Sequence, residues 1–139
     1  MTTRYGTQLL GDLYGCDRNR IRNGEFLYRF LLDLVAFLGM RAMGGPHLDV
    51  YTGPHRSWDG FSATVHIQTS HVTLHAFAVG YVFIDIFSCQ PFDVTAAQHF
   101  VRDALEDRGG FSAEWRVIDR GYNFPGALVD PSMREVGVP

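Results

Sequence analysis

Residues 61–89 read FSATVHIQTSHVTLHAFAVGYVFIDIFSC, and this stretch predicts three consecutive β-strands. The segments 61–67, 72–79 and 81–89 are rich in Val, Ile, Thr, Phe and Tyr, which pack well on a pleated sheet. Gly80 separates the last two segments and suits a tight turn. We therefore expect these two segments to form an antiparallel hairpin.

Two segments outside this stretch have the spacing of helices. Between residues 23 and 40, apolar residues recur at steps of three and four, as they do on one face of an amphipathic helix. Asn23 is a suitable N-cap for this helix. A second helix is expected over 94–107, with Asp93 as its cap and a glycine pair as its stop.

The remaining segments complete an α+β fold. Residues 5–14 predict a first strand, the chain becomes β-like from about residue 48, and 112–118 predict a last strand. Two helices are too few to cover both faces of this sheet, so we expect a two-layer αβ sandwich with a mostly antiparallel sheet and both helices on one face. A second copy of the chain is the simplest cover for the other face, which predicts a homodimer or a larger homo-oligomer.

Length and composition narrow the class of protein. The 139 residues fit one domain over 1–122 and a C-terminal extension over 123–139. The net charge of −3 gives no reason to expect nucleic acid or an anionic membrane as partner. There is no apolar run of the roughly 18 residues that a membrane span needs, and the first residues lack the apolar core of a signal peptide. With two cysteines and no disulfide framework, a cytoplasmic protein with free thiols is expected.

Chemically versatile side chains gather in one region of the sequence. Ser70, His75 and Cys89 lie within twenty residues, with further histidines beside them. A Ser-His-acid hydrolase would hold its serine on a sharp turn bounded by glycines, and residues 68–71 contain none. This grouping therefore favours a catalytic site of another kind.

A metal site at these histidines is not expected. His71 and His75 would form a metal-binding pair on a helix, but this segment has the composition of a strand. In a strand they share one face with Thr73, and the only nearby candidates for a third ligand are Cys89 and Asp85.

Short motifs in this region carry a family resemblance. Residues 70–75 read Ser-His-Val-Thr-Leu-His, which resembles the Ser-His-Leu-Thr-Ile-His motif of the bacterial and archaeal S-adenosylmethionine decarboxylases. The likeness runs from about residue 5 to 117. Further matches to the family's short motifs occur in order along the chain: Tyr14–Asp17, Gly60–Ser62, Gly80-Tyr81, Ile84-Asp85 and Phe87–Cys89.

The resemblance implies a self-processing enzyme with a small-molecule substrate. In that family the proenzyme cuts its own backbone before a serine, here between Thr69 and Ser70, and the serine becomes a pyruvoyl group. Ser62 and His75 match residues that assist self-cleavage, and Cys89 matches the general acid that protonates the substrate carbon. An α-keto amide accepts the electrons that decarboxylation releases, as pyridoxal phosphate does, and a thiol can return the proton.

The chain departs from the family pattern at the cleavage site and in the substrate pocket. The family usually has Glu where this chain has Thr69. Its Trp-Pro-Glu, whose acid helps to bind the ribose of the substrate, is replaced by residues 76–79, Ala-Phe-Ala-Val. The aromatic residue that stacks on adenine has no clean match. Candidate substrate-binding residues are those at or near these positions: Arg56, Trp58, Phe61 and Phe77.

Three functions remain open at this point. The first is a pyruvoyl-dependent decarboxylase of S-adenosylmethionine in polyamine (spermidine) synthesis. The second keeps the mechanism but acts on a smaller amino acid such as ornithine or arginine, which the missing acid favours. The third is an uncleaved, inactive homologue that binds a ligand or partner, which Thr69 favours. An unrelated lyase on a similar fold is a more distant alternative.

Overall fold

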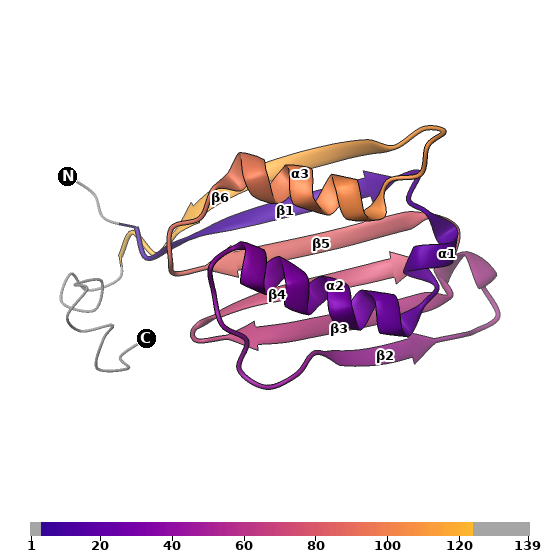
Figure 1. Ribbon diagram of the computed structural model, residues 1–139, viewed down its shortest axis with the longest axis horizontal. Coiled ribbons are helices and arrows are strands. Elements are labelled where there is room, and N and C mark those ends of the chain that lie inside the picture. Colours follow the sequence, from indigo (N-terminus) through magenta and orange to yellow (C-terminus); the bar gives the residue numbers. More distant parts are fainter. Residues whose placement is uncertain (1–3, 124–139) are drawn as a thin grey trace.

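A computed structural model describes residues 4–123 of the chain, so nearly all of the predicted C-terminal extension lies outside the described residues. Figure 1 shows one sheet with the helices gathered on one of its faces. The elements in chain order are β1 (Gly6–Tyr14), α1 (Arg18–Ile21), α2 (Gly24–Phe37), β2 (His47–Tyr51), a 3-10 turn (Arg56–Trp58), β3 (Gly60–Ile67), β4 (Ser70–Phe77), β5 (Tyr81–Ser88), α3 (Val94–Leu105) and β6 (Ser112–Arg120).

The six strands form a single antiparallel sheet. Their spatial order is β2-β3-β4-β5-β1-β6, and every neighbouring pair is antiparallel. The central strands β3, β4 and β5 are the three that residues 61–89 predicted. The predicted two-layer α+β sandwich, with both long helices on one face, is confirmed (Figure 1).

Capping residues fix where the two long helices begin. The Asn23 side chain accepts a hydrogen bond from the Phe26 backbone N–H at 3.2 Å, and Asp93 accepts one from Ala96 at 2.9 Å. Both helices end earlier than predicted, at Phe37 and Leu105.

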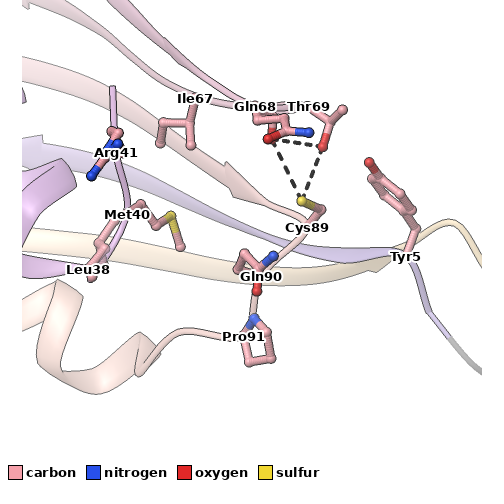
Figure 2. A pocket seen from close by; sticks show the side chains of 11 residues that line it. Tyr5, Leu38, Met40, Arg41, Ile67, Gln68, Thr69, Cys89, Gln90 and Pro91 are labelled. Carbon is pink, nitrogen blue, oxygen red and sulfur yellow. Dashed lines mark hydrogen bonds between the residues drawn. The ribbon is translucent and has the colours of Figure 1, made fainter. Parts of the chain in front are cut away.

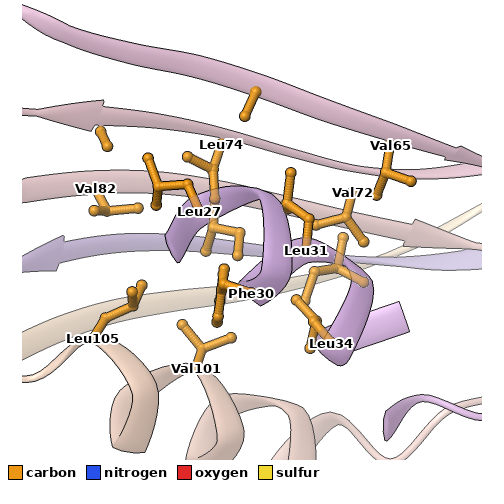
Figure 3. Packing of buried hydrophobic residues seen from close by; sticks show 14 of the residues in the cluster. Leu27, Phe30, Leu31, Leu34, Val65, Val72, Leu74, Val82, Val101 and Leu105 are labelled. Carbon is orange, nitrogen blue, oxygen red and sulfur yellow. The ribbon is translucent and has the colours of Figure 1, made fainter. Parts of the chain in front are cut away.

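The core lies between the helices and one face of the sheet. Along β4, burial alternates strictly, so that Val72, Leu74 and Ala76 face the helices. Figure 3 shows α2 and α3 packed over these strands. Its labelled side chains come from both layers: Leu27, Phe30, Leu31 and Leu34 of α2, Val101 and Leu105 of α3, and Val65, Val72, Leu74 and Val82 of the sheet.

Two short elements were not predicted. Helix α1 has four residues, and its cap Asp17 accepts hydrogen bonds from the backbone N–H groups of Asn19 and Arg20. The 3-10 turn Arg56–Trp58 has three residues. Neither is long enough to show a hydrophobic period, which is why the sequence pattern did not predict them.

The face of the sheet opposite the helices carries polar and aromatic side chains. His71, Thr73 and His75 of β4 lie on this face, as the sequence predicted. The neighbouring side chains of β5 are partly exposed, with Tyr81 46% and Phe83 42% accessible. We call this face the outer face. None of the helices within residues 4–123 is long and apolar enough to cross a membrane.

Candidate active site

Ser70 is the first residue of β4 and lies at a junction between two strand ends. The two-residue turn Gln68–Thr69 joins β3 to β4 directly before it. Ser70 belongs to the helix-facing side of the strand and is only 7% exposed. Its Oγ accepts a hydrogen bond from the backbone N–H of Cys89 at 3.0 Å. This bond places the serine beside the residue that follows β5.

Thr69 has an unusual backbone conformation. Among residues 4–123, it is the one non-glycine residue with a positive φ, at +53°. A β-branched side chain in this left-handed region is strained, typically by about 1–3 kcal/mol. The strained residue contributes the carbonyl carbon of the Thr69–Ser70 peptide bond. This is the bond at which the family resemblance predicts cleavage.

The Thr69 side chain connects the turn to the Cys89 thiol. Its Oγ1 lies 2.8 Å from the carbonyl oxygen of Gln68 and 3.1 Å from the Cys89 sulfur, and it can donate to either. The Cys89 thiol can itself donate to the Gln68 carbonyl oxygen at 3.7 Å. Figure 2 shows the thiol pointing toward both turn residues. The turn, the serine and the cysteine thus form one hydrogen-bonded group.

A cavity of about 370 Å³ opens beside this group. Figure 2 shows the side chains that line it. Thr69 and Cys89 form part of its wall, and polar side chains of Tyr5, Arg41 and Gln90 form another part. The cavity has room for part of a small molecule next to the Cys89 thiol.

Ser62 and His75 form a second group at a different place. Ser62 of β3 lies directly opposite His75 of β4, and its Oγ is 2.7 Å from His75 Nδ1. A cavity of about 500 Å³ adjoins them. Its wall is aromatic, with Tyr51, Trp58 and Phe77, whereas the Phe61 ring lies on the helix-facing side of β3, against Gly24.

The two groups do not meet within one chain. Ser70 and His75 are five residues apart on one strand, which corresponds to about 16 Å and to opposite faces of the sheet. Within a single chain the three candidate catalytic residues Ser70, His75 and Cys89 therefore do not all lie together. The structure pairs Ser70 with Cys89 and His75 with Ser62 instead.

Arg56 lies apart from the other candidate substrate-binding residues. It lines a cavity with Arg22, Ser57 and Asp59, whereas Trp58, Phe61 and Phe77 line the one beside His75. The sequence analysis grouped all four because they lie at or near the positions where the chain departs from the family's substrate pocket. The 3-10 turn rotates successive side chains away from each other, so that Arg56 and Trp58 face different cavities.

Two further features of the site concern other titratable groups. Asp85 on β5 accepts a hydrogen bond from Gln8 at 2.8 Å and lies 3.5 Å from His71 Nε2, so the outer face has an ordered polar network that the sequence analysis missed.

Burial raises the pKa of the Cys16 thiol to about 12, which makes this cysteine unreactive. Within residues 4–123, no group of three His, Cys, Asp or Glu side chains is arranged to hold a metal ion.

Comparison with known proteins identifies the family. The family model described as S-adenosylmethionine decarboxylase matches residues 7–121, most of the chain. The chain belongs to the S-adenosylmethionine decarboxylase family. The resemblance seen in the motifs is thereby confirmed, and the family is one of carboxy-lyases.

Individual members of the S-adenosylmethionine decarboxylase family are similar along most of their length. The S-adenosylmethionine decarboxylase proenzyme of Anoxybacillus flavithermus is 28% identical over 117 residues, covering 84% of this chain and 87% of the relative. That of Shouchella clausii is 30% identical over 102 residues, covering 72% and 74%. The crystal structure of the adenosylmethionine decarboxylase from Aquifex aeolicus has the same fold, with a TM-score of 0.71 at 21% identity over 86% of this chain and 92% of that one.

Proposed function

We propose that this chain is a pyruvoyl-dependent decarboxylase of S-adenosylmethionine that matures by self-cleavage between Thr69 and Ser70. The observation that carries the proposal is the hydrogen bond from the Cys89 backbone N–H to Ser70 Oγ at 3.0 Å, directly after the strained Thr69. It holds the serine that would be transformed next to the thiol that would return the proton. Polyamine synthesis as the pathway rests on the family resemblance, and the cytoplasm as the location rests on the two cysteines and the lack of a disulfide framework.

The cleavage step needs only groups of this chain and water. Ser70 Oγ attacks the carbonyl carbon of Thr69, and the C–N bond of the peptide breaks as an ester forms. Elimination then releases the Thr69 carboxylate, and hydrolysis of the remaining residue consumes one water and releases ammonia. The left-handed strain at Thr69 favours the forward direction, because the residue relaxes once its peptide bond is broken.

Cys89 is the proposed proton donor in turnover. A pyruvoyl group at position 70 supplies an electron sink when carbon dioxide leaves the substrate. The Cys89 thiol is suited to protonate the substrate carbon because it lies at the wall of a cavity and beside Ser70. The residues present therefore fit the group that the family implies.

We further propose that two copies share each site. Ser62 and His75 match residues that assist cleavage, yet within one chain they lie on the far side of the sheet from Ser70. A two-fold dimer through the outer faces would bring Ser62 and His75 of the partner subunit to the start of β4, where they would approach the Thr69–Ser70 peptide bond from the outer face, because the Ser70 side chain itself points toward the helices. The partly exposed aromatic side chains of β5 supply apolar area for such a contact.

The aromatic cavity beside His75 favours S-adenosylmethionine over a basic amino acid. Among the described residues that line it, Tyr51, Trp58 and Phe77 are aromatic and none is a carboxylate. Aromatic faces stack on a flat ring such as adenine and attract a sulfonium cation. Ornithine and arginine lack a purine ring that could stack across several of these side chains.

A decarboxylation assay tests this choice of substrate. Carbon dioxide release is compared for S-adenosylmethionine, ornithine and arginine at equal concentrations. We expect turnover of S-adenosylmethionine, and a roughly tenfold or larger rise in KM for Trp58→Ala from the loss of stacking area. Arg56→Ala, which alters a different cavity, is the matched control. Preferred turnover of ornithine or arginine would refute the assignment and establish the smaller-substrate alternative.

An uncleaved homologue is the second candidate function, and Thr69 is the observation that favours it. The Thr69 hydroxyl forms a hydrogen bond within the turn, to the carbonyl oxygen of Gln68. The family usually has Glu at this position. Such a protein would bind a ligand in the same cavities and would persist as one full-length chain. Intact mass separates the two candidates.

A further inference from the structure

Cys89 lies just beyond the end of a strand, so the sheet does not set its backbone conformation. Strand β5 ends at Ser88, whose partner in the ladder is Thr7 of β1. The Ser88 carbonyl is so close to β1 that a Cβ added at Gly6 would lie 2.5 Å from its oxygen. Ser88 is therefore a fixed anchor, whereas the next two residues form a bend outside the ladder. The thiol that the proposed mechanism uses belongs to this bend.

A buried hydroxyl closes the bend around Cys89. Ser88 is 1% exposed. Its Oγ accepts a hydrogen bond from the Gln90 backbone N–H at 2.9 Å, and it can donate to the Gln90 carbonyl oxygen at 2.8 Å or to Met40 Sδ at 3.5 Å. The bond from residue 90 back to residue 88 closes a small ring around Cys89, which we call the Ser88 ring. Pro91 follows directly and confines Gln90 to extended backbone conformations, so the bend is held on both sides of the cysteine.

Maturation, as proposed above, changes the contacts that Cys89 makes with the neighbouring turn. In the uncleaved chain its N–H donates to Ser70 Oγ, and its sulfur lies 3.1 Å from Thr69 Oγ1. Elimination breaks the bond between Ser70 Oγ and Cβ, so this oxygen leaves residue 70 as part of the Thr69 carboxylate. Both contacts then involve a chain end that is no longer joined to residue 70. The Ser88 ring lies wholly within residues 70–139, and cleavage breaks none of its bonds.

We propose that Ser88 is a positioning residue for the proton donor Cys89 in the mature enzyme. Its hydroxyl holds the bend so that the thiol stays at the cavity wall after the contacts with Thr69 and Ser70 have changed. In turnover the S–H bond breaks, a C–H bond forms at the substrate carbon, and the sulfur regains a proton from water. Ser88 acts on this transfer through Cys89. The role in turnover rests on the proposed function, whereas the ring itself does not.

A displaced thiol should affect the chemical step more than substrate binding. A general acid must lie within hydrogen-bond reach of the atom that it protonates. The aromatic cavity beside His75 is the proposed place of substrate binding, and none of its lining residues belongs to the bend. Loss of the Ser88 hydroxyl should therefore lower kcat and leave KM unchanged. Cleavage should be little affected, because in the uncleaved chain the bond to Ser70 Oγ also holds Cys89.

The test compares Ser88→Thr with Ser88→Val. Threonine and valine have nearly the same shape and differ in the hydroxyl, so any strain from the larger side chain is common to both. Both variants should cleave at rates within about twofold of each other. The kcat for carbon dioxide release should be about fivefold lower in Ser88→Val than in Ser88→Thr at equal KM, as expected for the loss of one hydrogen bond.

Three results would overturn the proposal. The first is equal kcat in the two variants, and the second is a difference confined to KM. The third is a lower unfolding midpoint in urea for Ser88→Val with an unchanged kcat, since the hydroxyl would then serve stability alone. If Ser88→Val does not fold, Ser88→Ala replaces it and is compared with the wild type by the same three criteria.

A second readout is independent of cleavage. A Ser70→Ala chain lacks both the attacking oxygen and the acceptor for the Cys89 N–H, so it isolates the Ser88 ring. Backbone hydrogen exchange of the peptide that contains Cys89 and Gln90 is measured in this background by mass spectrometry. Exchange should be about fivefold faster with Ser88→Val than with Ser88→Thr, because the Gln90 N–H loses its acceptor.

The two readouts separate this proposal from the proposed function. If the Ser70-containing protein stays full length while exchange differs between the variants, self-cleavage and the role in turnover are refuted and the Ser88 ring stands. If that protein is cleaved and active while exchange and kcat are equal in the two variants, the positioning role is refuted and the proposed function stands.

Discussion

At the scale of single residues, Ser70 and Cys89 have separate tasks that two substitutions can distinguish. In the proposed mechanism Ser70 supplies the oxygen that attacks the Thr69 carbonyl, whereas Cys89 contributes a backbone N–H to Ser70 and a thiol to the cavity. Only the side chain of Cys89 is lost on substitution by alanine, so the bond to Ser70 Oγ is kept.

Ser70→Ala should therefore abolish cleavage, because no hydroxyl remains to attack. Cys89→Ala should still cleave, while its turnover falls by roughly a hundredfold from the loss of a general acid. Gel electrophoresis reports cleavage and carbon dioxide release reports turnover. Unchanged turnover in Ser70→Ala would exclude the pyruvoyl mechanism.

Cys16 provides a pH-dependent prediction. Burial raises the pKa of its thiol from 9.0 to about 12 in the folded state, so the folded chain holds this proton more tightly than the unfolded chain does. The stabilisation is complete below about pH 9 and is lost as the pH rises toward 12. The free energy of unfolding in urea should thus fall more steeply over this range in the wild type than in Cys16→Ala. Parallel slopes in the two proteins would contradict the burial of this thiol.

Parts of the site could be read from single residues and parts could not. The alternation of β4 was predictable, and it already implied that Ser70 and His75, five residues apart, lie on opposite faces. The positive φ of Thr69 could not be predicted, because threonine disfavours that region and only the turn geometry imposes it.

At the scale of elements, hairpins place the candidate residues. The two-residue turn Gln68–Thr69 fixes the register that sets Ser62 opposite His75. The turn at Gly80 does the same for β4 and β5, which brings the end of β5 back beside the start of β4. Strand segments and both long helices followed from periodicity, whereas cross-strand partners depend on turn lengths that the pattern alone does not give.

The Gly80 turn can be tested by a matched pair of substitutions. Gly80 has φ +111°, which side chains rarely adopt, while the nearest atoms to an added Cβ are 3.5 Å away and leave room for it. Gly80→Ala should therefore destabilise the fold by about 1–3 kcal/mol through backbone strain alone. Gly109→Ala adds a Cβ in open space without a positive φ and should change stability little. Equal unfolding midpoints in urea for both variants would contradict the turn geometry.

At the scale of the whole molecule, the separation of the two groups across the sheet is the reason for proposing a second copy at the site. The helices cover only one face of the sheet (Figure 1). The outer face, with Ser62 and His75, is therefore available for contact. The fold class followed from counting helices against strands, but the proposal that two copies share a site required the positions of the side chains.

Co-expression of Ser70→Ala and His75→Ala chains tests the shared site. Each variant alone should be inactive. In a mixed dimer, Ser70 of one copy meets His75 of the other once, so an equal mixture should recover about a quarter of the wild-type activity, since half of the dimers have one complete site in two. Tagged chains purified by two affinity steps report the mixed dimer. Inactivity of a correctly formed mixed dimer would contradict sharing.

The central claim is self-cleavage before Ser70, and the intact mass of the purified protein under denaturing conditions tests it most directly. The account predicts two chains, residues 1–69 with a free carboxylate at Thr69 and residues 70–139 with a blocked pyruvoyl N-terminus. A single species at the full 15.6 kDa after long incubation would contradict it.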